Sequence, residues 1–356
     1  MMDSLSTRFQ HLLIIDPIIL QTSQPSWPYL PVELIQRILE KAWTSPLTGE
    51  EVTSMLTSLP LVSKTFLAIY NRLAFRDVHV ATEDYSDRFQ PLLSSRTPEK
   101  EAYCEAHPLL SIPSPTTINS LCRSITFHIP GLGGYPGKDP IQLYSENHPM
   151  GQALSGTLYQ LKRLPWLPSL RHITIEYTNW GYNDIFDQDR LLDLPLRVST
   201  LELRYLFTAN IGKRSIRGLS NRYFGRQRWR SGHYSLPGVR ELIVSGDCLD
   251  IVVDVAHMCP TLKVLEVDEL KGISVLAPLP PSVHTLVLRS GRGFILNDDS
   301  LQEMQLERAL KNKLFGSSEH PRIILESASV DPTVFNYTVN LCQNHDIELI
   351  HRSLYV

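Results

Sequence analysis

Seven basic residues and four aromatic residues are interleaved within residues 212–234, and no acidic residue accompanies them. Arginine forms paired hydrogen bonds with phosphate and carboxylate groups, and aromatic rings stack on bases. The segment therefore fits three roles: a solvated insertion, a contact for an acidic or phosphorylated protein segment, or a contact for nucleic acid. Charge runs are most often exposed faces, and nucleic acid is the least favoured role. The candidate substrate-binding residues are Arg217, Arg222, Arg226, Arg228, Trp229 and Arg230.

Metal chemistry has little support in the sequence. Two Cys-x-x-His pairs have the spacing of half a zinc site, at Cys104 and His107 and at Cys342 and His345. A structural zinc site needs four converging ligands, and these pairs lie far apart in the chain. The acidic run over residues 184–193 lacks the glycine and the terminal glutamate of a calcium loop. We predict no metal and no cofactor.

The glycine-rich segment at residues 131–139 suggests a phosphate-binding loop, but its residues do not match one. Leu132 stands where the first glycine of a P-loop belongs, and Asp139 replaces the Ser or Thr that binds magnesium. Pro136 occupies the third glycine of the dinucleotide motif. The chain has no G-x-S-x-G motif, and its twelve histidines are dispersed. We predict a protein that is not an enzyme.

The composition fits a folded chain of about two domains. The chain has 356 residues, of which 42% are hydrophobic and 20% charged, and its formal net charge is −3. This charge does not favour electrostatic binding of the whole molecule to nucleic acid or a membrane. The five cysteines are odd in number and scattered, which is poor material for a disulfide framework. Without a signal-peptide pattern or a membrane-spanning run, we predict a cytoplasmic or nuclear protein with no membrane partner.

Three short helices and a strand are predicted in the first part of the chain. The first helix opens at Pro31, whose missing N–H suits the first helical position. The second has a capping box at Thr48 and should end or kink at Pro60, and the third covers residues 62–73, before a strand at residues 75–80. A unit this small rarely supplies more than a few kcal/mol from its own core, which indicates that it packs on a neighbour or a partner. The predicted apolar face of the first helix comprises Leu34, Ile35, Ile38, Leu39 and Ala42.

The rest of the chain repeats the strand pattern apolar-x-x-apolar-x-apolar. Three of the five intervals between repeats match the roughly 20 to 29 residues of a leucine-rich repeat, and the two longer ones indicate insertions. Proline precedes five of the six repeats by two or three residues, and weaker candidate strands follow at residues 320–325 and 347–350. The repeats start at Cys122, Leu170, Val198, Val239, Leu262 and Val283.

The energetics favour stacking of these repeats. Three buried apolar side chains contribute roughly 5–9 kcal/mol, whereas ordering a repeat costs a few tens of kcal/mol in backbone entropy. No single repeat can fold alone, so the strands must pair side by side and share one continuous core. His172 and His284 fall at x positions of the pattern, where we expect them to face outward.

Three short runs stand out in the first part of the chain: Leu30-Pro31-x-Glu33-Leu34-x-x-x-Ile38-Leu39, Leu61-Val62-Ser63-Lys64-x-Phe66 and Phe75-Arg76-x-Val78. Together they resemble the F-box, above all the F-box-like proteins abundant in fungi, which commonly carry an irregular leucine-rich-repeat region behind the box. The resemblance covers residues 28–80 closely and the rest of the chain only in architecture. It implies an α+β fold: an N-terminal three-helix F-box followed by an irregular leucine-rich-repeat-like α/β solenoid.

The resemblance also implies a function. Such a protein is a substrate-recognition subunit of an SCF-type cullin–RING ubiquitin ligase. Its F-box docks the Skp-type adaptor and, through it, the cullin, and its repeat domain holds a protein substrate, whose identity here is unknown. In that family the Leu-Pro pair and apolar residues of the following helices meet the adaptor. The matching positions here are Leu30, Pro31, Leu34, Ile38, Leu61, Val62 and Phe66.

Two departures from the compact F-box leave an alternative open. Residues 44–58 are longer than the corresponding part of the F-box, and Pro60 interrupts the helix that leads to the Val-Ser-Lys motif. The alternative is a leucine-rich-repeat interaction scaffold that works outside any ligase, and a nucleic-acid binder using residues 212–234 is less favoured. The predicted parts are an N-terminal segment at 1–26, an F-box domain at 27–82, a linker at 83–120 with at most one short helix, and a leucine-rich-repeat-like substrate-binding domain at 121–356.

Overall fold

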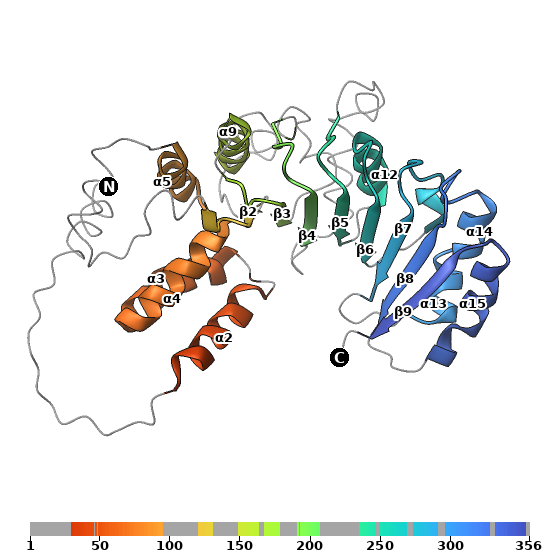
Figure 1. Ribbon diagram of the computed structural model, residues 1–356, viewed down its shortest axis with the longest axis horizontal. Helices are drawn as coiled ribbons and strands as arrows, with labels where there is room; N and C mark the ends of the chain where they lie inside the picture. The colour runs from red at the N-terminus through yellow and green to blue at the C-terminus, as the bar shows by residue number, and fades with distance from the viewer. Residues whose placement is uncertain are drawn as a thin grey trace, which may run out of the picture.

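Nine parallel strands form one sheet, and their order in the sheet follows their order in the chain (Figure 1). The computed structural model describes residues 30–45, 47, 49–94, 120–130, 149–163, 167–178, 191, 193–206, 235–246, 249–268, 273–290, 296–327 and 332–353. The strands are β1 (Asp77–Val80), β2 (Ser124–Pro130), β3 (His172–Thr178), β4 (Thr200–Leu206), β5 (Glu241–Ser245), β6 (Val264–Asp268), β7 (Thr285–Arg289), β8 (Arg322–Ser327) and β9 (Glu348–Ser353).

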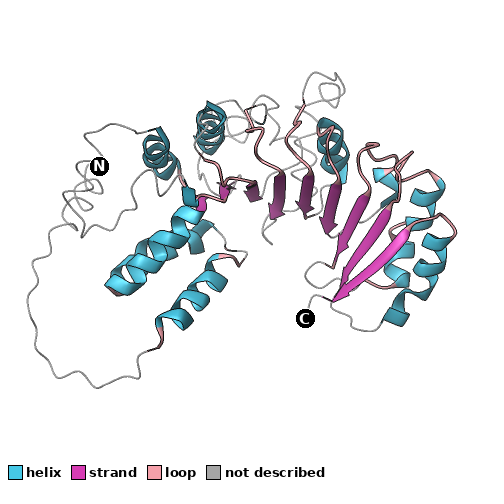
Figure 2. Cartoon of the chain, in the orientation of Figure 1, coloured by secondary structure: helices cyan, strands magenta, loops and turns pink. Residues whose placement is uncertain are grey.

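Helices flank the sheet on one side along most of its length, while three N-terminal helices lie at the β1 end on the other side (Figure 2). The N-terminal three-helix unit consists of α2 (Val32–Trp43), α3 (Gly49–Val62) and α4 (Lys64–Arg76). The flanking helices are α5 (Glu83–Ser94), α9 (Pro149–Arg163), α12 (Leu249–Met258), α13 (Asp298–Glu303), α14 (Leu306–Lys311) and α15 (Asn336–Gln343), with short 3₁₀ turns η4 (Ile273–Leu276) and η5 (Pro332–Phe335).

All six predicted strand patterns are strands of this sheet, and the two weaker candidates are β8 and β9. The first apolar position of each pattern is fully buried. Successive strands keep the same register, so equivalent apolar residues stack into one continuous core beneath the helices. One such row runs through Val78, Ile125, Ile173, Leu201, Leu242, Leu265, Leu286, Ile323 and Leu349.

The prolines before the strands belong to a turn that recurs along the sheet. The N–H of Leu170 donates to the carbonyl of Leu167, and the N–H of Val239 donates to the carbonyl of Leu236. The proline occupies the second position of both turns, where its fixed φ is favoured. The last residue of each turn is the buried first position of a strand pattern. Equivalent bonds close the turns at Val198, Leu262 and Val283.

The sheet begins earlier than the sequence indicates. The strand expected at the end of the three-helix unit is β1, and it pairs in parallel with β2. It therefore lies in the sheet although it precedes the boundary predicted at residue 82. The predicted linker starts with a twelve-residue helix, α5, which contacts β1 and α9. Together, β1 and α5 join the three-helix unit directly to the repeated strands.

Details of the three-helix unit differ from the sequence-based expectation. Pro31 is the N-cap of α2 rather than its first helical residue, because its carbonyl accepts the N–H groups of Leu34 and Ile35. Helix α3 does not stop at Pro60 but continues to Val62, so Pro60 lies in its last turn. The cap predicted at Thr48 lies outside the described residues.

The three-helix unit has a small core of its own. Its centre is Trp43, which is 1% exposed and meets Tyr70 edge to face with ring centroids 5.7 Å apart. This core is separate from the large core of the sheet, which indicates that the unit packs semi-independently. The other buried members are Leu39, Ile69, Leu73 and Ala74, with Ile35, Met55, Leu56, Leu59 and Phe66 packed around them.

Candidate functional site

The apolar face predicted for α2 divides into an inward and an outward part. Leu39 is buried in the core of the three-helix unit and Ile35 packs against it. Leu34 and Ile38, one turn apart on the same face of the helix, are exposed. Exposed apolar side chains at a helical spacing do not stabilise the folded chain, so they mark a surface available to a partner.

More exposed apolar residues come from the ends of the neighbouring elements. Leu30 and Val32 lie at the start of α2, and Leu61 and Val62 form the end of α3. Six of the ten large hydrophobic residues that the described chain exposes belong to this three-helix unit. We define the apolar patch as Leu30, Val32, Leu34, Ile38, Leu61 and Val62.

The fold places the patch at the end of the three-helix unit that points away from the sheet. The C-terminal end of α2 is held at the sheet because the indole N–H of Trp43 donates to the carbonyl of Asp77 at 2.8 Å. Helix α4 runs directly into β1, so its first residue, Lys64, lies at the far end. A helix of twelve or thirteen residues is about 18–20 Å long. The starts of α2 and α4, and with them the end of α3, therefore lie far from β1 (Figure 1).

Ser63 fixes the junction at the centre of the patch. It lies between α3 and α4 in an extended conformation, and its hydroxyl accepts the N–H of Phe66 at 3.2 Å. This N-cap lets α4 start immediately after α3 ends, which leaves Leu61 and Val62 on the outside of a tight corner. Phe66 itself is partly buried against the core of the unit. Of the seven predicted adaptor-binding residues, six are exposed and Phe66 is partly buried.

The sheet presents a different surface on the side away from its core. Side chains alternate along a strand, so the residues between the buried rows all point to this side. We call this surface the polar face, because carboxylates, imidazoles and guanidinium groups predominate on it. From β1 to β4 its principal members are His79, Thr126, His128, His172, Thr174, Glu176, Glu202 and Arg204, and from β6 to β9 they are Glu266, Asp268, Arg289, Glu326 and Arg352.

Glu202 organises the polar face at β3 and β4. Its carboxylate accepts from Arg204 Nε at 2.6 Å and from Thr174 Oγ1 at 3.1 Å, and it lies 3.0 Å from His172 Nε2. Burial raises the pKa of Glu202, but the hydrogen bonds from His172 and Arg204 outweigh burial and lower it to about 2. His172 faces away from the core, as the pattern predicts, and its Nε2 lies near both this carboxylate and Thr174 Oγ1.

Glu266 occupies the corresponding place on β6. Its carboxylate lies 2.7 Å from Arg289 NH1, and Arg289 Nε also contacts Glu326 at 3.0 Å. Burial raises the pKa of Glu266 to about 7 against the opposing effect of Arg289, and the neighbouring Glu326, Glu241 and Glu202 raise it further. Burial is therefore the main reason that Glu266 is hard to ionise, and the neighbouring carboxylates add to it.

A buried histidine pair joins the polar face to the three-helix unit. His79 Nδ1 lies 2.9 Å from His128 Nε2, and His128 Nδ1 lies 2.9 Å from Glu176. The ring of His79 also meets Trp43 edge to face with centroids 5.0 Å apart. Burial lowers the pKa of His79 to about 3, with His128 adding to the effect, so His79 is neutral. No sequence motif marks this contact, because its residues come from separate elements.

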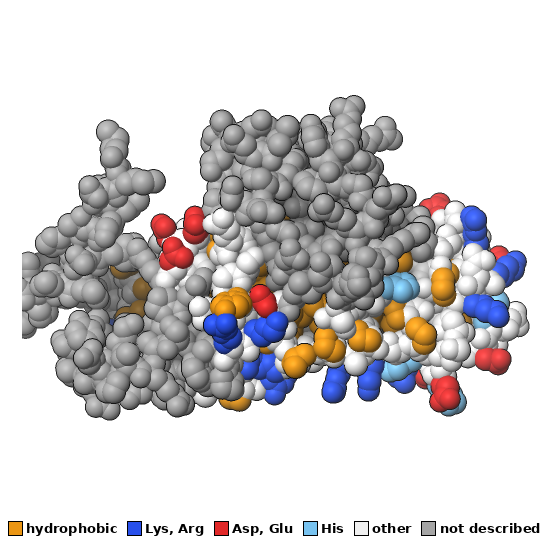
Figure 3. All heavy atoms as spheres, turned by 90° about the horizontal axis from the view of Figure 1, so that it is seen from above, with side chains coloured by type: hydrophobic (Ala, Val, Ile, Leu, Met, Phe, Trp, Pro, Cys, Tyr) orange, Lys and Arg blue, Asp and Glu red, His pale blue; other side chains and the backbone are white. Residues whose placement is uncertain are grey.

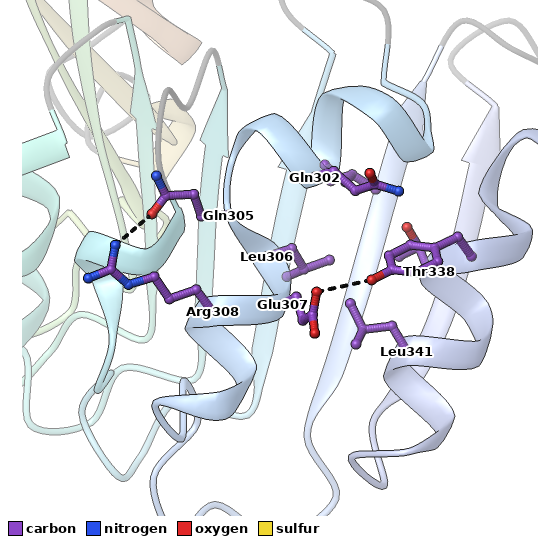
Figure 4. A pocket seen from close by; sticks show the side chains of 9 residues that line it. Gln302, Gln305, Leu306, Glu307, Arg308, Thr338 and Leu341 are labelled. Carbon is purple, nitrogen blue, oxygen red and sulfur yellow. Dashed lines mark hydrogen bonds between the residues drawn. The ribbon is translucent and has the colours of Figure 1, made fainter.

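The structure also contains a shallow hollow of about 220 Å³ between α13, α14 and α15. Leu306 and Glu307 on α14 and Leu341 on α15 line it (Figure 4). Glu307 pairs with Lys311 at 2.6 Å and accepts from the hydroxyl of Tyr337 at 3.1 Å, and all three groups are in solvent. Acidic and basic side chains are mixed on this end of the molecule (Figure 3). Nothing in this arrangement resembles a catalytic cluster.

Several residues singled out in the sequence lie outside the described residues. These include the whole basic segment at 212–234, the glycine-rich segment at 131–139 and Cys104 with His107. Cys342 is a buried thiol whose pKa burial raises to about 12. Among the described residues, no group of three or more His, Cys, Asp or Glu side chains is arranged to hold a metal ion.

Within the same residues, no helix has both the length and the apolar character needed to cross a membrane. Comparison of the chain with known proteins gives no match to any family model, any curated protein or any solved structure. The functional argument therefore depends on the apolar patch and the polar face themselves.

Proposed function

We propose that this chain is a substrate-recognition subunit of an SCF-type cullin–RING ubiquitin ligase and not itself an enzyme. In this proposal the three-helix unit is an F-box that docks a Skp-type adaptor through the apolar patch. The nine-stranded sheet with its helices is an irregular leucine-rich-repeat-like solenoid that holds the substrate protein. The chain thus links a target to the ligase by two separate surfaces.

The exposure of the apolar patch is the observation that carries the proposal. The resemblance to the F-box assigns adaptor contacts to seven residues from the sequence: Leu30, Pro31, Leu34, Ile38, Leu61, Val62 and Phe66. Six of them are exposed in the structure, on α2, just before it and at the end of α3, and Phe66 is partly buried. A unit with so small a core would not place this much apolar surface in water without a partner to cover it.

The arrangement of the strands supports the solenoid part of the proposal. Nine parallel strands in chain order, joined through recurrent turns before the buried first position, are what stacked leucine-rich repeats produce. The two long intervals of the sequence pattern fall between β2 and β3 and between β4 and β5. The polar face offers hydrogen-bonding groups from several strands to one ligand.

A co-purification assay with the Skp-type adaptor tests the docking surface. We expect the full-length chain to retain the adaptor and its variant Leu61→Lys to lose it. Removing one buried leucine contact costs roughly 1.5–3 kcal/mol, about 10-fold to 100-fold in affinity, and burying the new ammonium group adds to the loss. The double variant Leu30→Ala with Pro31→Ala should act in the same direction.

Leu196 provides a matched control. It is 74% exposed, against 72% for Leu61, but it lies in a turn before β4, away from the three-helix unit. Leu196→Lys should therefore bind the adaptor as the wild type does. If the wild-type chain failed to bind, or both lysine variants bound equally well, the apolar patch would not be the docking surface, and an interaction scaffold without a ligase would be the better account.

A further inference from the structure

The two edges of the nine-stranded sheet differ in how their outward backbone groups are covered. At the β1 edge the carbonyl of Arg76 accepts the N–H of Arg123 and so faces β2. The next carbonyl, that of Asp77, points outward, and the indole of Trp43 donates to it. Helices α4 and α5 adjoin β1 in the chain and contact it. The first edge of the sheet is therefore partly covered by the chain's own residues.

The β9 edge has no comparable closure within the described part of the chain. The N–H of Glu348 donates to the carbonyl of Pro321, so Glu348, Ile350 and Arg352 direct their backbone groups toward β8. The backbone groups of Leu349 and His351 then point outward, since alternate residues of a strand face opposite neighbours. No described strand pairs with this side, and β9 contains no proline. An open edge of this kind is a template for another strand.

The side chains of β9 are complementary to themselves when the strand is reversed. Glu348 and Arg352 lie two residues before and two residues after Ile350, and all three point to the polar face. An antiparallel copy centred on Ile350 would place Glu348 opposite Arg352 of the second copy, and Ile350 opposite its equivalent. Charged residues normally protect an edge, but these two have opposite signs and equal distances from the centre.

The backbone agrees with the same register. In an antiparallel pair, directly opposed residues alternate between those that exchange two hydrogen bonds and those that exchange none. With Ile350 at the centre, Leu349 opposes His351 of the second copy, and these are the residues whose backbone groups point outward. Glu348, Ile350 and Arg352 then fall at the sites without hydrogen bonds, where opposed side chains approach most closely.

Arg352 is available for this contact. Its side chain is 57% exposed, and its contact with Glu326 is a long one of 3.7 Å. Glu348 is exposed as well. We propose that two copies of the chain associate through β9, antiparallel across a two-fold axis at Ile350, to join their sheets into one. An isologous contact of this type closes on itself and does not propagate.

The contact involves one six-residue strand on each side, so it belongs with small, transient interfaces, and the dimer should depend on concentration. It lies at the opposite end of the sheet from the three-helix unit. Dimerisation therefore does not rest on the proposed adaptor docking, and either proposal can fail without the other.

Sedimentation-velocity ultracentrifugation of the full-length chain over a range of concentrations tests the inference. We expect a reversible monomer–dimer equilibrium for the wild type. Glu348→Arg and Arg352→Glu, taken singly, place like charges opposite each other at both ends of the contact, and each should lower the association constant at least about 10-fold. The double variant exchanges the two charges, restores the pairing and should regain dimerisation.

The double variant also controls for misfolding, because a single variant that lost dimerisation by misfolding would not regain it through a second substitution. Circular dichroism should show the same secondary structure in all four proteins. A wild type that stays monomeric at every concentration would overturn the proposal, as would a dimer that neither single variant weakens. Single variants that dissociate without rescue in the double variant would overturn the antiparallel register.

Discussion

The apolar patch and the polar face are the two surfaces of this molecule that most resemble binding sites, and they are built in opposite ways. The patch consists of single apolar side chains that touch little within the chain. The polar face consists of ionisable side chains that are largely buried and paired with one another. The patch therefore lacks a partner that the fold itself could supply, whereas the polar face already satisfies most of its own groups.

This difference separates the two roles. A surface whose substitution leaves the fold intact but abolishes a contact is a docking surface. A surface whose substitution unfolds the chain serves stability first, and it can bind only through groups that its own ion pairs leave available. Substitutions among the buried pairs of the polar face should therefore cost stability, whereas substitutions in the apolar patch should cost binding.

Removing the carboxylate of Glu202 should have the largest effect. Glu202→Ala removes the buried carboxylate that hydrogen-bonds to both Arg204 and His172, which costs about 3–5 kcal/mol of the free energy of unfolding. Urea denaturation followed by circular dichroism measures it. Glu348→Ala, on the exposed part of the same face, should change stability by no more than about 0.5 kcal/mol. Equal effects would mean that the pairs around Glu202 contribute no stability.

Two adjacent residues of α2, one buried and one exposed, should differ in how much stability their truncation costs. Leu39→Ala removes a buried side chain from the core of the three-helix unit and should cost about 2–5 kcal/mol. Ile38→Ala, one position earlier, should leave the free energy of unfolding within about 0.5 kcal/mol, because Ile38 is exposed and alanine favours a helix. Ile38→Ala should nevertheless weaken adaptor binding. A large loss of stability in Ile38→Ala would show that the patch is part of the core.

Glu266 should make stability depend on pH. Its pKa is raised to about 7 in the folded chain from 4.5, so its contribution to stability is complete below about pH 4.5 and is lost as the pH rises to about 7. Glu266→Gln removes this dependence. The difference in free energy of unfolding between variant and wild type should therefore shift by up to about 3 kcal/mol in favour of the variant between about pH 4 and about pH 8.

Glu202 should make stability depend on pH in the opposite direction in the same experiment. Its pKa is lowered to about 2, so its contribution is present above about pH 4.5 and is lost as the pH falls toward 2. Chemical denaturation at a series of pH values measures both groups. Glu266→Gln and wild type losing stability in parallel between pH 4.5 and 7 would contradict the assignment to Glu266.

A modest loss of stability is expected at the junction of α3 and α4. Ser63→Ala removes the hydroxyl that accepts the N–H of Phe66 and should cost about 1 kcal/mol. Ser63→Asp restores an acceptor and a favourable charge at the start of α4, so it should recover most of the loss. Thermal unfolding measures both. If both variants matched the wild type, the cap would not fix this corner.

The strands could be predicted from the sequence because burial of apolar side chains determines both the repeated sequence pattern and the register of neighbouring strands. Each apolar pair, such as Leu201 with Leu203, is apolar because it faces the core, and the turn prolines mark where each strand begins. The F-box resemblance names every residue of the patch except Val32, whereas helical periodicity alone assigns Leu34 and Ile38 to the same face as the buried Leu39.

The polar face could not be predicted in the same way. Its partners are brought together by the pairing of neighbouring strands: Thr174 and Glu202 are 28 positions apart in the chain, and His79 and His128 are 49 apart. An x position of the pattern indicates only that a side chain points away from the core, so nothing in the sequence distinguishes Glu202, which is paired and buried, from Glu348, which is exposed. Only the register of the sheet provides that information.

Isothermal titration of the purified chain with the Skp-type adaptor tests the central claim most directly, with Leu61→Lys and Leu196→Lys as the matched pair. The account predicts that the wild type and Leu196→Lys bind equally, that Leu61→Lys binds at least about 10-fold more weakly, and that all three unfold at the same urea concentration. Equal binding of the two variants, or no binding by the wild type, would contradict the assignment of the apolar patch as the docking surface.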